Sequence, residues 1–235
     1  IFTRTPHSRR PSGVSRTIDM EQTILTPWQQ TVLHLVSRKR ELEKFYLSGG
    51  TALAGFYLHH RVSDDLDFFC MEQPDSFLVE QAANEIATTL VAQTRFEKIH
   101  DRRLFFFKKD GEELKIEFSR YPFPHLEPIN TFDGVRVASL RDIAAGKLAA
   151  LIDRFDPKDF VDLYFLLETR SLDEIRLDAE TKFSFNISPL FLGTELAKVR
   201  RIEALPKMVK PLSVDILRDF FTRQATLLKP NILDV

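Results

Sequence analysis

The chain has 235 residues, 43% of them hydrophobic, and a formal net charge of −1. This composition is typical of a globular protein and leaves room for one large domain, or for a catalytic domain with a helical lobe. The single cysteine, Cys70, excludes internal disulfides and cysteine-rich zinc sites. No segment is long enough to cross a membrane, so we expect a cytoplasmic protein.

The near-neutral charge gives no general indication of nucleic-acid binding. A nucleic-acid ligand would therefore need a local basic patch, and the simpler interpretation of the available cations is a solvated helix face. The candidates are Lys198, Arg200, Arg201, Lys207 and Lys210.

Residues 1–20 hold four arginines among serine, threonine and proline with little apolar pattern, so we expect a disordered tail. This tail lacks the apolar core of a secretion signal, and an organelle transit peptide is the weaker alternative. Met20 is an alternative start, in which case the tail is a product of gene prediction or cloning. After it, Thr26 and Pro27 predict a capped helix that runs to about Arg40.

The next segment predicts a buried strand that ends in a glycine turn. Residues 44–47 are apolar and aromatic, Gly49 and Gly50 break the strand, and Thr51 can cap a helix that runs to Leu58. Such a turn can bind phosphate, because its free N–H groups and the helix dipole face outward and glycine lets oxygens approach the main chain. An ordinary turn is the alternative. The candidate phosphate-binding residues are Ser48, Gly49, Gly50 and Thr51.

Alternating carboxylates follow. The strand period of two places Asp65 and Asp67 on one face and sends Leu66 and Phe68 into the core. Mg²⁺ would remove the repulsion between the two charges, and it favours carboxylate and phosphate oxygens together. A solvated strand face would by itself explain the alternating aspartates. A glycine turn followed by paired carboxylates, however, favours a site that binds a metal and a triphosphate.

Two residues just before the carboxylates are expected near the triphosphate. Ser63 is a candidate hydroxyl donor, and Arg61 is a candidate cation for phosphate or a partner for a nearby carboxylate. A capping serine and a surface arginine are the structural alternatives.

A hairpin is predicted further along, because residues 104–107 and 113–118 are strand-like and the segment between them contains Asp110-Gly111. Glu117 would lie on its polar face and could join Asp65 and Asp67 as a third metal ligand. A carboxylate on the solvated face of a hairpin is an equally good interpretation.

Ser139 opens a predicted helix to Asp153, in which Lys147 borders the apolar face. The lysine must either extend along the surface to solvent or find an anion such as a triphosphate. In the following helix, residues 157–169, Asp159 can complete a capping box begun by Asp156 and so has a structural explanation.

Asp162 has no such explanation. Its neighbours are apolar nearly all round, so we expect it to be held by a cation at the wall of the cleft, with a structural salt bridge as the alternative. The candidate partners are Lys147, Arg154 and Lys158. Two further helices are predicted over 188–201 and 213–228.

The motifs resemble those of the nucleotidyltransferase superfamily, most closely its AbiEii/AbiGii toxin branch. They stand here as Gly49-Gly50-Thr51-Ala52-Leu53, Arg61-Val62-Ser63-Asp64-Asp65-Leu66-Asp67-Phe68, Lys147, and Lys158-Asp159-Phe160-Val161-Asp162. The resemblance covers roughly residues 45–167. It implies an α/β, nucleotidyltransferase-like mixed sheet in residues 21–137 and a helical lobe in residues 138–235 that completes the active-site cleft.

The resemblance also implies an activity, in which the glycine turn binds an NTP, the paired aspartates hold Mg²⁺ and a nucleotidyl group passes to an acceptor. On that pattern the essential residues are Ser63, Asp65, Lys147 and either Asp159 or Asp162. We therefore expect an NTP-dependent, pyrophosphate-releasing toxin of a toxin–antitoxin system that acts on tRNA or protein and pairs with an antitoxin protein. The alternatives are a small-molecule, antibiotic-modifying transferase and a non-catalytic nucleotide-binding protein of the same fold.

Overall fold

The computed structural model describes residues 15–16 and 24–228. Within them one mixed sheet has the strand order β1-β7-β8-β2-β3-β6-β5-β4. The strands are β1 (Ser15–Arg16), β2 (Tyr46–Ser48), β3 (Leu66–Cys70), β4 (Gln93–Ile99), β5 (Arg102–Lys109), β6 (Glu112–Arg120), β7 (Asn130–Phe132) and β8 (Val135–Val137). β1 pairs in parallel with β7. Apart from the two residues of β1, the disordered tail expected over residues 1–20 lies outside the described residues.

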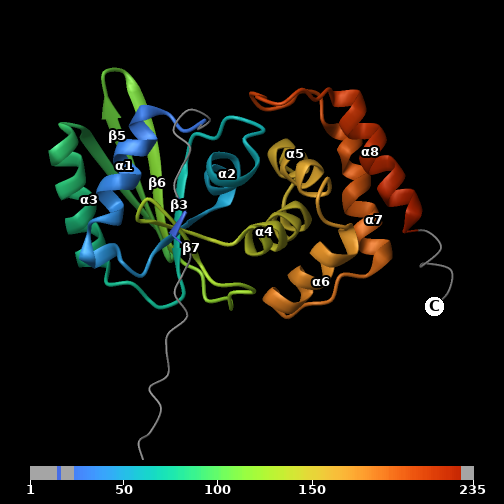
Figure 1. The fold of residues 1–235 in the computed structure, drawn as a ribbon, viewed down its shortest axis with the longest axis horizontal. Coiled ribbons are helices and arrows are strands. Elements are labelled where there is room, and N and C mark those ends of the chain that lie inside the picture. The colour runs from blue at the N-terminus through green and yellow to red at the C-terminus, as the bar shows by residue number, and fades with distance from the viewer. Residues whose placement is uncertain (1–14, 17–23, 229–235) are drawn as a thin grey trace, which may run out of the picture.

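Helices cover both sides of the sheet (Figure 1). α1 and α3 lie on one side, and α2 and the helices that follow β8 lie on the other. The helices are α1 (Pro27–Ser37), α2 (Gly49–Leu53), α3 (Ser76–Leu90), α4 (Leu140–Asp153), α5 (Pro157–Leu166), α6 (Leu172–Phe183), α7 (Pro189–Ala197) and α8 (Val214–Leu227). Short 3-10 turns occur at Arg40–Leu42 and Lys198–Arg201, and α2 continues into a π-helical turn, Ala54–Leu58.

Local signals explain several of these elements. Thr26 caps α1 and forms a reciprocal capping box with Gln29, and Ser139 caps α4. The predicted hairpin is confirmed, because Asp110 and Gly111 adopt φ values of 52° and 85° between β5 and β6. Positive φ at both turn residues matches the twist of the strands and favours Asp-Gly.

The structure differs from the predicted elements in two places. Helix α6 was not among the predicted helices, although Ser171 and Glu174 form a capping box at its start. Its sequence is too polar to show a clear apolar stripe, and only Ile175 and Ala179 supply buried hydrophobic side chains. Thr51 does not cap a helix: α2 begins at Gly49, so Thr51 lies inside it and donates its hydroxyl hydrogen to the Asp65 carbonyl oxygen.

A continuous hydrophobic core joins the sheet to the helices. Leu47 of β2 and Phe118 of β6 belong to the same buried cluster as Leu148 of α4 and Phe221 of α8. The strands end by Val137 and the elements that follow are helical: α2 packs on β2 and β3, α4 packs against α2, and α5 packs against α4. None of the helices in the described residues combines the length and apolar character needed to span a bilayer.

Candidate active site

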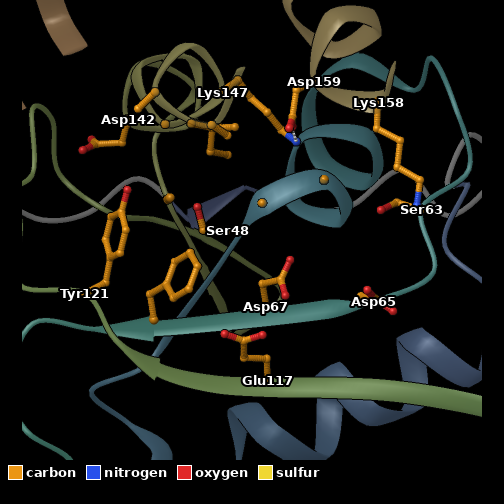
Figure 2. A pocket seen from close by; sticks show the side chains of 18 of the residues that line it. Ser48, Ser63, Asp65, Asp67, Glu117, Tyr121, Asp142, Lys147, Lys158 and Asp159 are labelled. Carbon is orange, nitrogen blue, oxygen red and sulfur yellow. Dashed lines mark hydrogen bonds and ion pairs between the residues drawn. The ribbon is translucent and has the colours of Figure 1, made fainter. Parts of the chain in front are cut away.

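A cavity of about 520 Å³ lies between the sheet and helices α4 and α5 (Figure 2). Its floor is formed by the β2–α2 turn, β3 and β6, and its other wall by α4 and the start of α5. A concave site lined by convergent polar groups is the usual location for binding and catalysis. Of the residues predicted from the sequence, the cavity is lined by Ser48, Gly49, Gly50, Arg61, Ser63, Asp65, Asp67, Glu117, Lys147 and Asp159.

The two glycines bring the main chain close to the charged groups. Gly49 has a φ of 70°, and a Cβ placed on it would lie 2.6 Å from Oδ2 of Asp67. A Cβ on Gly50 would lie 2.6 Å from a guanidinium nitrogen of Arg61 and 2.9 Å from Oγ of Ser63. The absence of side chains therefore lets the turn, the carboxylate and the guanidinium meet at one end of the cavity.

Gly49→Ala should destabilise the protein more than Gly111→Ala, which is a matched control. Both glycines have positive φ, so alanine adds backbone strain of about 1–2 kcal/mol at either position. Nothing lies within 4 Å of a Cβ on Gly111, whereas a Cβ at position 49 would collide with the Asp67 carboxylate. Urea denaturation of both variants measures the difference, and equal losses would show that Asp67 moves aside freely.

Of the three predicted metal-binding carboxylates, Asp67 has the fewest partners that offset its negative charge. It lies directly beside Glu117, its partner in the parallel β3–β6 register (Figure 2). Burial, followed by the charge of Glu117, raises the pKa of Asp67 to about 6, although Lys115 opposes the shift. Its carboxylate accepts no hydrogen bond within the described part of the chain. An ionised Asp67 therefore needs a cation.

The other two predicted metal ligands are already paired. Lys115 Nζ lies 3.0 Å from Asp65 Oδ2. Glu117 accepts hydrogen bonds from Arg102 at 2.7 and 2.5 Å and from the Ser119 hydroxyl at 2.6 Å. Burial alone would raise the pKa of Glu117, but these hydrogen bonds hold it below its usual value.

The described residues contain no preformed cluster of three or more histidine, cysteine or acidic groups arranged for a metal ion. The donor chemistry nevertheless fits a hard cation such as Mg²⁺, because Asp67 is uncompensated and Asp65 is half-exposed beside a lysine that can release it. Glu117 fits less well, since Arg102 already neutralises it. The three-carboxylate metal set therefore stays a prediction, and Asp65 and Asp67 are its better supported members.

The loop before β3 is held in place from two sides. The side-chain amide of Gln29 on α1 donates to the carbonyl oxygens of Ser63 at 2.7 Å and Asp64 at 3.2 Å. On the other side, Val62 N donates to the carbonyl oxygen of Lys207 at 2.8 Å. Ser63 is thus positioned by residues far away in the chain, and sequence reasoning did not identify Gln29.

A buried ion-pair network links this loop to α4 and α5. Asp162 accepts hydrogen bonds from Arg61 Nε at 2.6 Å and Nη2 at 2.8 Å, and its carboxylate lies 2.6 Å from Lys147 Nζ. His60 Nε2 lies 2.7 Å from the same carboxylate. Burial would raise the pKa of Asp162, but Lys147, Arg61 and His60 hold it far below its usual value. Asp162 is 0% exposed and does not line the cavity.

Asp162 is held by Lys147, as expected, but the positions of the two aspartates of α5 relative to the cavity differ from the expectation. Asp159 does not complete a capping box: its carboxylate accepts from Lys147 Nζ at 3.0 Å and Arg154 Nε at 3.1 Å, and it lines the cavity. Asp162, expected at the wall of the cleft, lies behind Lys147. The physical reason is the direction of the side chains, because positions three apart on a helix share a face but differ in depth when the helix tilts against its neighbour.

Lys147 approaches the cavity from α4 beside Asp159 (Figure 2), and its Nζ also pairs with Asp162. Burial lowers its pKa, but Asp162 and Asp159 reverse that effect and raise it above the usual lysine value. The ammonium group is therefore charged at neutral pH. Lys147 is 8% exposed, so it does not extend to solvent; of the two predicted alternatives it finds anions, which are Asp159 and Asp162.

The cavity continues beyond Asp67 to an end that sequence analysis did not identify. Aromatic rings line it there together with an ion pair, in which Lys182 Nζ lies 2.6 Å from Asp142 Oδ1. The rings belong to Tyr46, Phe69, Tyr121 and His125. They come from β2, β3, the end of β6 and the following loop, so no local motif in the sequence marks them.

Comparison with known proteins identifies the family. The model of the family described as "Nucleotidyl transferase AbiEii toxin, Type IV TA system" matches residues 32–220. An uncharacterised protein of Aquifex aeolicus is 37% identical over 142 residues, which make up 59% of this chain. The matched region spans 65% of the length of that relative.

Solved structures share the fold at low sequence identity. A candidate nucleotidyltransferase from Helicobacter pylori has a TM-score of 0.60 at 19% identity, with 89% of this chain and 98% of that chain covered. MenT4, a nucleotidyltransferase toxin from Mycobacterium tuberculosis, also has a TM-score of 0.60, at 15% identity with 86% and 82% covered. The predicted α/β nucleotidyltransferase fold is thereby confirmed. Since the family model spans most of the chain, this protein belongs to the AbiEii nucleotidyltransferase toxin family.

Proposed function

We propose that the cavity binds an NTP with Mg²⁺ and transfers its nucleotidyl group to an acceptor, with release of pyrophosphate. The observation that carries this proposal is the uncompensated Asp67 carboxylate, which faces a glycine turn surrounded by cations. A site that places anionic ligands and cationic side chains together suits a substrate that brings both a divalent cation and a chain of phosphates.

The triphosphate would occupy the end of the cavity next to the glycine turn. Gly49 and Gly50 leave room at the main chain, and the Ser63 hydroxyl is a donor to phosphate oxygens. The cations that line this part are Arg61, Lys115, Lys147, Arg154 and Lys158. Arg61 and Lys147 are fixed by Asp162, so they need no rearrangement to oppose negative charge as it develops.

Asp65 and Asp67 would hold Mg²⁺, and Lys115 would leave Asp65 for a phosphate oxygen when the metal binds. A metal ion held there would supply positive charge that offsets the negative charge of the substrate phosphates. The acceptor oxygen forms a bond to the α-phosphorus, the bond to the bridging oxygen breaks, and pyrophosphate leaves with its electron pair. The acceptor proton passes to solvent.

For the acceptor we propose tRNA or protein, and for the partner an antitoxin protein, because the matching family is a toxin family of toxin–antitoxin systems. We also propose that the enzyme acts in the cytoplasm. The basic residues considered as a tRNA patch lie at the 3-10 turn after α7 and in the segment that precedes α8; Arg201 is placed 4.4 Å over the ring of Phe155. They do not line the cavity.

Chelation of divalent cations should abolish activity, and Mg²⁺ should restore it. The assay uses an NTP labelled at the α-phosphate, with cellular RNA or protein as acceptor, and measures both incorporated label and pyrophosphate. Without metal, Asp65 and Asp67 repel the substrate phosphates, so we expect a loss of about 10³-fold or more. Undiminished turnover in the chelator would contradict the assigned role of the carboxylates.

The same assay separates the alternatives. Label found only in small molecules would favour an antibiotic-modifying transferase, and NTP binding without pyrophosphate release would favour a non-catalytic nucleotide-binding protein.

A further inference from the structure

The aromatic end of the cavity has no part in the phosphate chemistry proposed above. We define the aromatic slot as the part lined by Tyr46, Phe69, Tyr121 and His125, with Gly146 on the opposite wall. In Figure 2 Tyr121 rises toward α4 on the side of Asp67 away from Ser63 and Lys158. Ser48, which precedes the glycine turn, lies between Tyr121 and Asp67 in this view, so the slot and the turn are neighbouring parts of one cavity.

The rings of the slot hold one another in place. Phe69 and Tyr121 are stacked, with centroids 4.6 Å apart and planes 17° apart. Tyr46 meets Phe69 and His125 edge-on, with centroids at 6.5 and 4.9 Å. Such packing restricts ring rotation, so the aromatic wall is preorganised for a flat partner.

The opposite wall is made of small residues. Helix α4 presents Gly146, Ala149 and Ala150 to the cavity. The nearest side-chain atom to a Cβ built on Gly146 is the Tyr121 hydroxyl oxygen, at 3.9 Å. The space between α4 and Tyr121 thus lacks a filling side chain at the point where a larger residue would close it.

Polar groups lie at the edge of the slot. Nδ1 of His125 is buried and has no hydrogen-bond partner among the described residues. Lys182 donates to Asp142 and to the carbonyl oxygen of Pro124 at 2.7 Å, which fixes the loop that carries His125. Because that Nδ1 is shielded from solvent, the polar atom offered to the edge of a flat ligand is the Tyr121 hydroxyl oxygen beside Gly146.

We propose that the aromatic slot binds a nucleobase. A base has two π-faces for stacking and hydrogen-bonding atoms at its edge, and it is joined through a sugar to a phosphate, which suits a slot in the same cavity as the glycine turn. This inference rests on the proposed function. The base belongs either to the donor NTP or to an RNA acceptor, and the two sources are distinguished by binding.

The experiment compares Gly146→Leu and Tyr121→Ala with the wild type. Leucine suits a helix interior better than glycine, so Gly146→Leu should fold and fill the slot. Phe77→Ala is the control, because Phe77 is an aromatic residue on α3 that is 72% exposed and outside the cavity. Circular dichroism and melting curves confirm folding, and calorimetry measures binding of Mg²⁺–NTP, Mg²⁺–tripolyphosphate and an RNA oligonucleotide.

We expect Gly146→Leu and Tyr121→Ala to bind NTP about tenfold or more weakly than the wild type and to bind tripolyphosphate equally well, because loss of stacking affects only the base. If NTP binding is unchanged but RNA binding falls by a similar factor, the slot binds a base of the acceptor. Unchanged binding of both ligands by folded variants would overturn the proposal.

The outcome also separates this inference from the proposed function. A wild type that transfers nucleotide, with variants that bind both ligands normally, would refute the slot alone. A wild type that binds NTP through the slot but releases no pyrophosphate would refute the transferase and support the slot. A wild type that binds neither NTP nor RNA would refute both.

Discussion

Replacement of Asp67 by asparagine should abolish nucleotidyl transfer and yet stabilise the folded protein. The variant keeps the shape of the side chain beside Gly49, but it removes the charge proposed to hold Mg²⁺. A loss of several kcal/mol of transition-state stabilisation corresponds to a decrease in kcat/KM of about 10³-fold or more. Label transfer from an α-labelled NTP at saturating Mg²⁺ measures the effect.

The stability of Asp67→Asn follows from the raised pKa. An unfolded aspartate ionises near 3.8, whereas Asp67 in the folded protein ionises at about 6. Between these values the unfolded state has lost a proton that the folded state keeps, so wild-type stability falls as pH rises and stays lower above pH 6. Each pKa unit corresponds to about 1.4 kcal/mol, so asparagine should raise the free energy of unfolding at neutral pH by up to about 3 kcal/mol.

Glu113→Gln is the control for Asp67→Asn, because Glu113 is an exposed carboxylate on β6 outside the cavity. It should change neither activity nor melting temperature. Wild-type activity in Asp67→Asn would contradict the metal-binding role. A lower melting temperature, measured without Mg²⁺ at neutral pH, would show that the folded protein stabilises the charged Asp67 and would contradict its raised pKa.

Asp162→Asn should have the opposite effect on stability and lower the free energy of unfolding by about 3–5 kcal/mol. The change leaves Arg61 buried without its carboxylate partner and removes one of the two carboxylates that pair with Lys147, and an uncompensated buried charge is strongly unfavourable. Typical domains unfold at about 5–15 kcal/mol, so a large share of the total stability is lost. Urea denaturation at neutral pH measures this loss.

The pH dependence gives a second test of Asp162. Its folded pKa lies far below the unfolded value of 3.8, so its stabilisation is fully present above that value and is lost as pH falls toward the folded pKa. The difference between wild type and Asp162→Asn should therefore stay constant from neutral pH down to about pH 4 and shrink below it. Asp219→Asn, an exposed carboxylate on α8, is the control. An unchanged melting temperature in Asp162→Asn would show that the network contributes nothing to stability.

Some of the site was predictable because its signals are local. The break at Gly49 and Gly50, the alternation at Asp65 and Asp67, and the Asp-Gly hairpin depend on backbone φ angles and on a strand period of two. Those properties act over a few residues, so the sequence alone indicates the turn, the two carboxylates and their strand. The family resemblance rests on the same short motifs.

Tertiary packing decided which charged groups are free and which are paired. Arg61 and Asp162 are separated by 101 positions and Asp65 and Lys115 by 50, so periodicity within either segment carries no information about the pairing. The packing of α5 against α4 buries both aspartates and places Asp159 at the wall of the cavity and Asp162 behind Lys147. The aromatic slot likewise exists only where β2, β3, β6 and α4 meet, because its walls come from segments that have no local signal in common.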